Sequence, residues 1–173
     1  MDTIKLTAPT VAFADDIMAF RRELIEAADA DAFAGCCGLE KCQTAEEWLD
    51  FLRVTRTGAN GKVPSSVYLA VRTKDNKIVG VIDLRHHIDH PILGLWGGHI
   101  GYSVRPDERG KGYAKEMLRL NLQNAKALGL KKVLVTCKRE NPASEKTILA
   151  NGGVLEKEIT VDGEYIKRYW ISI

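Results

Sequence analysis

The chain has 173 residues, of which 45% are apolar and 28% charged, and its 25 Lys and Arg residues nearly balance its 23 Asp and Glu residues. This composition is that of an average folded domain, which excludes a disordered chain, a collagen-like repeat and a disulfide-stabilised miniprotein. The net charge of +2 argues against nucleic acid as a partner. At this length one hydrophobic core suffices, so residues 1–173 are predicted to form a single domain.

The sequence shows no sign of export or membrane insertion. No stretch approaches the roughly 20 apolar residues that span a bilayer, and the first residues carry Asp2 and Lys5 without an apolar core. The spacing of the four cysteines matches no zinc pattern of paired Cys-x-x-Cys units. We therefore expect a cytoplasmic protein with reduced thiols and no metal.

The N-terminal half is predicted to begin with a strand and two helices. From Val11 to Ala30, apolar residues recur at helical spacing, and acidic residues near the start suit the positive end of the helix dipole. Thr44 and Glu47 have the spacing of a capping box and open a second helix, which ends before Gly58. The strands expected in this half cover residues 4–7, 66–73 and 77–87.

The C-terminal half is predicted to alternate strands with helices and to end in a hairpin. An amphipathic helix is expected over about 110–128, and a shorter helix starts at Pro142 and ends before Gly152. Asp162-Gly163 is typical of a type I′ hairpin turn. The strands expected here cover residues 98–104, 132–137, 154–161 and 165–173. This order predicts an α/β (α+β) fold, with one mixed, mostly antiparallel sheet of about seven strands and about four flanking helices.

The segment between strand 98–104 and helix 110–128 carries the strongest functional signal. It reads Arg-Gly-Lys-Gly-Tyr-Ala over residues 109–114, and its two glycines leave backbone N–H groups uncovered by side chains. The helix N-terminus that follows adds a partial positive charge, so this corner suits a phosphate or pyrophosphate. Neither the Walker pattern nor G-x-G-x-x-G fits, because the sixth position of the latter is Lys115. A glycine-rich turn that only caps a structural helix is the alternative.

Residues 109–114 match R-x-x-G-x-A, the pyrophosphate signature of the GNAT acetyltransferase family, and the preceding strand resembles the G-H-I-G-Y-x-V-R-P strand of bacterial predicted acetyltransferases. Downstream, the run 141–144, Ile148 and Gly152-Gly153 resemble the next motif of that family. The resemblance covers roughly residues 78–156. It implies a GNAT fold and transfer of an acetyl group from acetyl-CoA to a primary amine, by direct attack in a ternary complex.

The resemblance also implies where acetyl-CoA would bind. Backbone N–H groups of residues 109–114 would hold the pyrophosphate, with Lys111 and Lys115 close to the phosphates. The pantetheine arm would pair with the edge of strand 98–104 as a pseudo-strand, where a backbone N–H would polarise the thioester carbonyl. The full set of cofactor-binding residues predicted in this way is Tyr102, Ser103, Val104, Arg109, Gly110, Lys111, Gly112, Tyr113, Ala114, Lys115, Asn141 and Ser144.

Acetyl transfer to an amine needs a base, because an alkyl ammonium has a pKa of about 10.4 and keeps its proton at neutral pH. His99 is the first candidate, since imidazole titrates near neutral pH and this one lies on the strand that leads to the acetyl group. Asp83, a carboxylate within an apolar run, is the second. Each also has a structural explanation: a histidine hydrogen-bonded within the sheet, and an aspartate paired with Arg85.

This chain differs from the usual family pattern in the residue expected to protonate the leaving thiolate. Many members place a tyrosine four residues before the glycine of the second motif, whereas this chain has Ile148 there. Ser144 is the alternative, acting directly or through water, and solvent alone is another. A metal site is not expected at His86 and His87, because adjacent residues of a strand point to opposite faces.

The acceptor does not follow from the fold. A small-molecule amine is slightly favoured over a peptide, because segments 31–43 and 88–96 can roof a compact pocket. A non-catalytic module that binds or senses acyl-CoA is the alternative function. A homodimer is left open, and neither nucleic acid nor a membrane is expected as a partner.

Overall fold

In a computed structural model of the protein, residues 2–29 and 31–173 are described, and they form seven strands and four α-helices. The strands are β1 (Ile4–Thr7), β2 (Ser65–Arg72), β3 (Ile78–Arg85), β4 (Tyr102–Val104), β5 (Lys132–Lys138), β6 (Val154–Val161) and β7 (Glu164–Ser172). The helices are α1 (Ala14–Ala27), α2 (Ala45–Thr57), α3 (Tyr113–Ala127) and α4 (Pro142–Leu149). These elements confirm the predicted fold class. Residue 30, the last of the first predicted helix, lies outside the described residues, as does residue 1.

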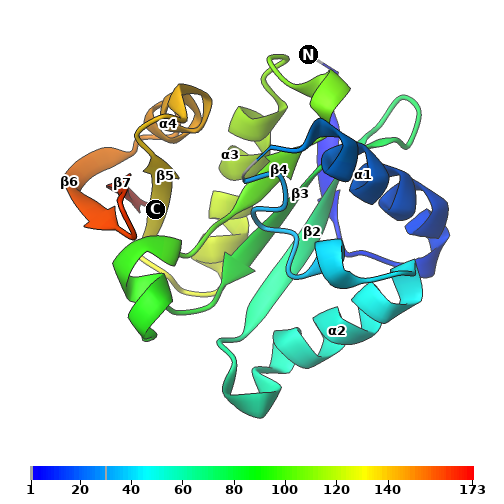
Figure 1. Ribbon diagram of the computed structural model, residues 1–173, viewed down its shortest axis with the longest axis horizontal. Coiled ribbons are helices and arrows are strands. Elements are labelled where there is room, and N and C mark those ends of the chain that lie inside the picture. The colour runs from blue at the N-terminus through cyan, green and yellow to red at the C-terminus, as the bar shows by residue number, and fades with distance from the viewer. Residues whose placement is uncertain (1, 30) are drawn as a thin grey trace.

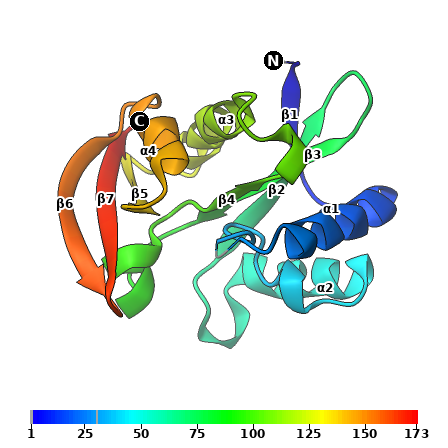
Figure 2. The same ribbon diagram turned by 45° about the horizontal axis from the view of Figure 1, so that its top comes forward.

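The strands divide into two sheets, whereas the sequence predicted one. An antiparallel sheet has the order β1-β2-β3-β4, and a second antiparallel sheet has the order β5-β7-β6. Helices α1 and α2 cover one face of the first sheet and α3 covers the opposite face, while α4 lies beside β5 (Figure 1, Figure 2). In the described part of the chain no β-ladder joins β4 to β5. The two sheets therefore diverge from one another between these strands.

Two hydrophobic cores hold the four-stranded sheet from both faces. On one face, Phe20 of α1 and Trp48 of α2 are fully buried against strand residues such as Leu69. On the other face, Met117 of α3 is fully buried with Ile82 of β3. Each such side chain contributes about 1.5–3 kcal/mol by leaving water. The edge strand β4 is thus attached to a firmly packed support.

Several local predictions are confirmed. Thr44 Oγ1 accepts a hydrogen bond from the Glu47 N–H at 3.2 Å and so caps α2. Asp162 and Gly163 both adopt positive φ angles, 49° and 83°, as a type I′ turn requires. Helix α1 ends earlier than predicted, because Ala28 takes a left-handed conformation with φ 53°. No helix among the described residues is long and apolar enough to cross a membrane.

The two sheets meet at His99. Its N–H donates to the carbonyl oxygen of Leu134 at 2.8 Å, and the Leu134 N–H donates back to the His99 ring nitrogen Nδ1 at 2.9 Å. The predicted strand 98–104 is regular only from Tyr102 onwards. The reason is that the N–H groups of His99 and Gly101 leave the ladder with β3 and bond to Leu134 and to the Asp83 side chain.

Candidate active site

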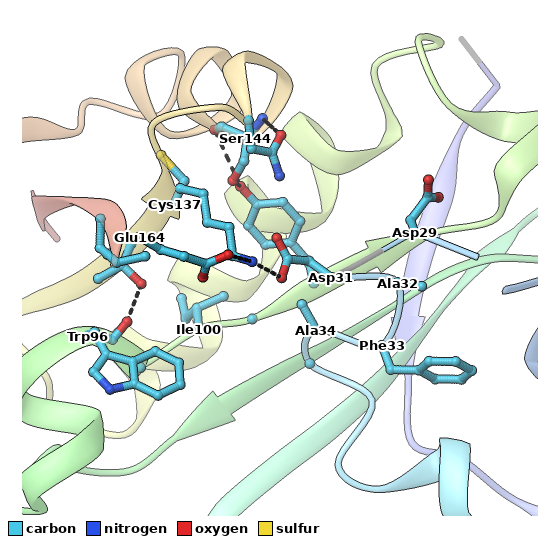
Figure 3. A pocket seen from close by; sticks show the side chains of 18 of the residues that line it. Asp29, Asp31, Ala32, Phe33, Ala34, Trp96, Ile100, Cys137, Ser144 and Glu164 are labelled. Carbon is cyan, nitrogen blue, oxygen red and sulfur yellow. Dashed lines mark hydrogen bonds and ion pairs between the residues drawn. The ribbon is translucent and has the colours of Figure 1, made fainter. Parts of the chain in front are cut away.

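Two adjoining cavities open where the sheets diverge. The helix-end cavity, of about 930 Å³, is lined by residues 108–110 and 112–115 at the N-terminus of α3. The strand-end cavity, of about 620 Å³, is lined by residues 31–35, Arg85 and Trp96 (Figure 3). The wall that the two cavities share consists of Asp29, Asp31, Ala32, Tyr102, Lys138, Asn141, Ser144 and Glu164. Ligands in the two cavities would therefore meet at this shared wall.

The helix-end cavity has the features of an anion site. Gly110 and Gly112 adopt φ angles of 72° and 89°, and Gly112 is the N-cap of α3 without a capping side chain. The first N–H groups of α3 consequently lack a partner within the helix and carry its partial positive charge. Such a helix end binds phosphate groups. All the predicted cofactor-binding residues line this cavity except Lys111.

The cationic side chains near this cavity differ in whether they line it and in their ion pairs with carboxylates of the protein. Lys111 pairs with the buried Glu108 at 2.9 Å, which explains why its side chain does not line the cavity. Lys115 does line it. The Arg109 guanidinium forms an ion pair with Asp29, on the far side of the cleft. An anionic ligand would therefore compete with Asp29 for Arg109.

Strand β4 offers a free edge to the cavities. The Asp83 N–H donates to the Gly101 carbonyl at 3.0 Å, so the odd-numbered residues of this segment bond towards β3. Alternate residues of an antiparallel strand direct their N–H groups to opposite sides. The N–H groups of Tyr102 and Val104 hence point away from β3, and none of the described residues forms a hydrogen bond with them. An extended ligand with amide groups suits such an edge.

Two hydroxyl groups meet at the shared wall. The Tyr102 hydroxyl of β4 lies 2.8 Å from Ser144 Oγ at the start of α4. Ser144 is itself positioned by the N-cap of that helix, because its N–H donates to Asn141 Oδ1 at 3.1 Å. Burial raises the pKa of Tyr102 to about 12, so its phenol keeps its proton at neutral pH.

Asp83 is fully buried and lines neither cavity. Its Oδ1 accepts the Gly101 N–H at 2.6 Å, and its Oδ2 lies 3.1 Å from an Arg85 nitrogen. Burial raises the pKa of this carboxyl group, and the Arg85 charge partly offsets that effect. Gly35 packs directly against Gly101, whose N–H is bonded to Asp83.

His99 is also buried and lines neither cavity. Because Nδ1 accepts the Leu134 N–H, the proton of the neutral ring is on Nε2. Burial, together with the charge of Arg85, lowers the pKa of His99 to about 4. This position favours a role in joining the sheets. The assignment of His99 as a base stays a prediction.

A set of ion pairs across the cleft was not foreseen from the sequence. Lys138 of β5 lies 3.2 Å from Asp31 and 2.8 Å from Glu164, so it links the segment after α1 to the β6–β7 hairpin. Asp31 and Glu164 accordingly point towards each other in Figure 3. No sequence motif predicts these ion pairs, because their partners are distant in the chain; Asp29 and Arg109, for example, are 80 positions apart. Within the described chain, no group of three or more His, Cys, Asp or Glu residues is placed to hold a metal.

Replacing Gly35 with alanine is expected to push the segment 31–37 away from β4. An added Cβ would lie 2.8 Å from the Tyr102 nitrogen and closer still to the Gly101 carbonyl. We expect a loss of about 1–3 kcal/mol in the free energy of unfolding, measured with denaturant. Gly61→Ala is the matched control, because Gly61 also has a positive φ but no atom within 4 Å of the added Cβ. Equal losses in the two variants would contradict the close contact.

Comparisons with known proteins show which family the chain belongs to. The model of the family "Acetyltransferase (GNAT) domain" matches residues 12–154. No curated protein matches the chain. Among solved structures, the Microcin C7 self immunity acetyltransferase MccE in complex with acetyl-CoA and AMP has 19% identity and a TM-score of 0.69, over 100% of this chain and 94% of that one.

Two further solved structures have the same fold. The ribosomal L7/L12 alpha-N-protein acetyltransferase RimL in complex with coenzyme A has 17% identity and a TM-score of 0.69, over 99% of this chain and 94% of that one. A mutant of the spermidine N-acetyltransferase SpeG from Vibrio cholerae has 15% identity and a TM-score of 0.64, over 98% of this chain and 94% of that one. The family match covers most of the chain, so the protein belongs to the GNAT acetyltransferase family and is an acyl-CoA-dependent N-acetyltransferase.

Proposed function

We propose that the protein transfers the acetyl group of acetyl-CoA directly to a small cationic amine, with both substrates bound at once. The observation that carries this proposal is the meeting of two cavities at one wall, which contains Tyr102 and Ser144. The helix-end cavity supplies an anion site for the cofactor. The strand-end cavity supplies a separate space for the acceptor.

In this proposal acetyl-CoA occupies the helix-end cavity from its phosphates to its thioester. The uncapped N-terminus of α3 would bind the pyrophosphate, with Lys115 beside it. The pantetheine arm would run along the free edge of β4 and bond to the N–H groups of Tyr102 and Val104. One N–H of this edge would also stabilise the negative charge that develops on the thioester oxygen.

The lining of the strand-end cavity favours a positively charged acceptor. Five carboxylates line it against the two cations Arg85 and Lys138. Its volume of about 620 Å³ lies within the range of small-molecule sites. Among the fold neighbours, SpeG is named as an acetyltransferase of spermidine, and RimL as one of a ribosomal protein. The carboxylates lining this cavity are Asp29, Asp31, Glu40, Asp162 and Glu164.

In the proposed reaction the amine nitrogen attacks the thioester carbonyl carbon, and the C–S bond breaks as the amide forms. We place the base among the carboxylates of the shared wall, Asp31 and Glu164, which can take the amine proton directly or through water. Asp83 and His99 line neither cavity, which supports structural roles for both. Ser144 is proposed to take part in proton donation to the sulfur, directly or through a second hydroxyl group. A cytoplasmic location and a homodimer stay predictions.

The proposal is tested by turnover with a panel of amines. Purified protein is incubated with acetyl-CoA and either a polyamine, a small monoamine or a lysine-containing peptide. Released CoA is measured with a thiol reagent, and the acetylated product by its mass. We expect turnover with the small cationic amines and a fall in kcat of about 10- to 100-fold in Ser144→Ala. Tight acetyl-CoA binding without turnover on any amine would favour a non-catalytic sensing module.

A further inference from the structure

The hydroxyl groups of Tyr102 and Ser144 bridge the cleft between the sheets. Tyr102 belongs to β4 of the four-stranded sheet, Ser144 belongs to α4 beside β5, and their oxygens are 2.8 Å apart. Both residues line both cavities. Resting on the proposed acetyl transfer, we infer that Tyr102 is a catalytic residue whose hydroxyl group delivers, with Ser144 behind it, the proton that the CoA sulfur takes up.

The bridge leaves one proton free for a ligand. Two hydroxyl groups carry two O–H protons, and the hydrogen bond between them uses one. When Ser144 donates this hydrogen bond, the Tyr102 O–H has only a long contact, 3.5 Å to the Ser144 carbonyl oxygen, and is free to donate to a ligand instead. The pair is held in place from the Ser144 side, because the Ser144 N–H donates to Asn141 Oδ1. Sulfur leaving the thioester at this wall would find a donor already positioned.

The proton transfers balance as a relay. When the C–S bond breaks, its electron pair stays on sulfur and the Tyr102 O–H proton moves to it. The Ser144 O–H proton moves to the Tyr102 oxygen, and water returns a proton to Ser144. The acceptor ammonium loses two protons in total: one goes to solvent, and the other is balanced by the proton that CoA gains. Burial raises the pKa of Tyr102 and disfavours its phenolate, so the Ser144 proton has to arrive as the Tyr102 proton leaves.

Other proton donors near the wall are less suited to this task. Ile148, at the position where many relatives carry a tyrosine, has no proton to give. The Lys138 ammonium lies at the shared wall but is bound to both Asp31 and Glu164, whose charges raise its pKa. In this proposal Tyr102 of β4 donates the proton that a tyrosine of the second motif would donate in those relatives. Its hydroxyl group reaches α4 from the opposite side of the cleft.

Tyr102→Phe tests the inference, because it removes only the hydroxyl group. We expect kcat to fall by about 10- to 100-fold, with KM for acetyl-CoA and for the amine changed less than about threefold. Tyr165→Phe is the control, since this exposed tyrosine lines neither cavity. The double variant Tyr102→Phe/Ser144→Ala should be no slower than the slower single variant, as two members of one relay are not additive.

A selenium analogue of acetyl-CoA separates a proton donor from a structural residue. A selenol is a stronger acid than a thiol and leaves readily without a proton. The kcat ratio of wild type to Tyr102→Phe should therefore shrink towards one with acetyl-seleno-CoA, whereas a packing defect would slow both cofactors alike. A wild-type kcat in Tyr102→Phe, or an equal loss with both cofactors, overturns the inference and leaves the proposed function standing. Absence of turnover by the wild type on every amine overturns both.

Discussion

Replacing Gly112 with aspartate is expected to weaken acetyl-CoA binding on the order of 100-fold or more. Gly112 is the N-cap of α3, so a carboxylate on this residue would lie beside the first N–H groups of the helix. Its negative charge would repel a pyrophosphate at this helix end. The helix itself would persist, because a negative charge at a helix N-terminus is favourable. Titration calorimetry with acetyl-CoA measures the loss.

The control for this variant is Gly112→Ala. Both substitutions put a Cβ on a residue with φ 89°, which costs roughly 1–2 kcal/mol of stability. Only aspartate adds charge, so its extra effect on affinity should also diminish at high salt. Unchanged affinity in Gly112→Asp would place the pyrophosphate elsewhere.

Replacing His99 with glutamine is expected to destabilise the fold by about 1–3 kcal/mol, because the buried Leu134 N–H loses its acceptor. Asparagine is the matched control. Its side-chain oxygen occupies nearly the same position as the imidazole Nδ1 and can accept the Leu134 N–H. His99→Asn should therefore keep much of the stability that His99→Gln loses. Denaturant unfolding of the three proteins at neutral pH measures the difference. Equal losses for glutamine and asparagine would argue against the importance of this hydrogen bond.

The same histidine gives the fold a defined pH dependence. The pKa of His99 is about 4 in the folded protein, below its ordinary value of 6.5, so the unfolded chain binds the proton more readily. The contribution of neutral His99 is complete above about pH 6.5 and is lost as the pH falls towards 4. Over that window wild type should lose up to about 3 kcal/mol relative to His99→Asn. Unfolding curves from pH 4 to 7.5 check this, and parallel curves would contradict it.

The parts of the molecule that depend on neighbouring residues could be predicted from the sequence. The capped start of α2, the hairpin turn at Asp162-Gly163 and the glycine-rich start of α3 each depend on residues only a few positions apart. The end of α1 was predicted too late, since no glycine marks the left-handed residue Ala28.

The features that depend on residues distant in the chain could not be predicted. The contact at which the two sheets meet is the pair of hydrogen bonds between His99 and Leu134, 35 positions apart. The Tyr102–Ser144 hydroxyl pair spans 42 positions. Periodicity indicates that a strand exists, but it does not indicate which of its N–H groups the partner strand will leave free. The site's side chains were therefore named in part, and the only pairing among them given by the sequence was that of Asp83 with Arg85, two positions away.

The ion pair between Arg109 and Asp29 bears on the way the cofactor enters. If the pyrophosphate binds at the helix-end cavity as proposed, acetyl-CoA would exchange its own negative charge for that of Asp29 on this arginine. Asp29 also lines the strand-end cavity, the proposed space for the acceptor. Binding of the cofactor would then change the wall of the acceptor space, which would favour an order of binding with acetyl-CoA first.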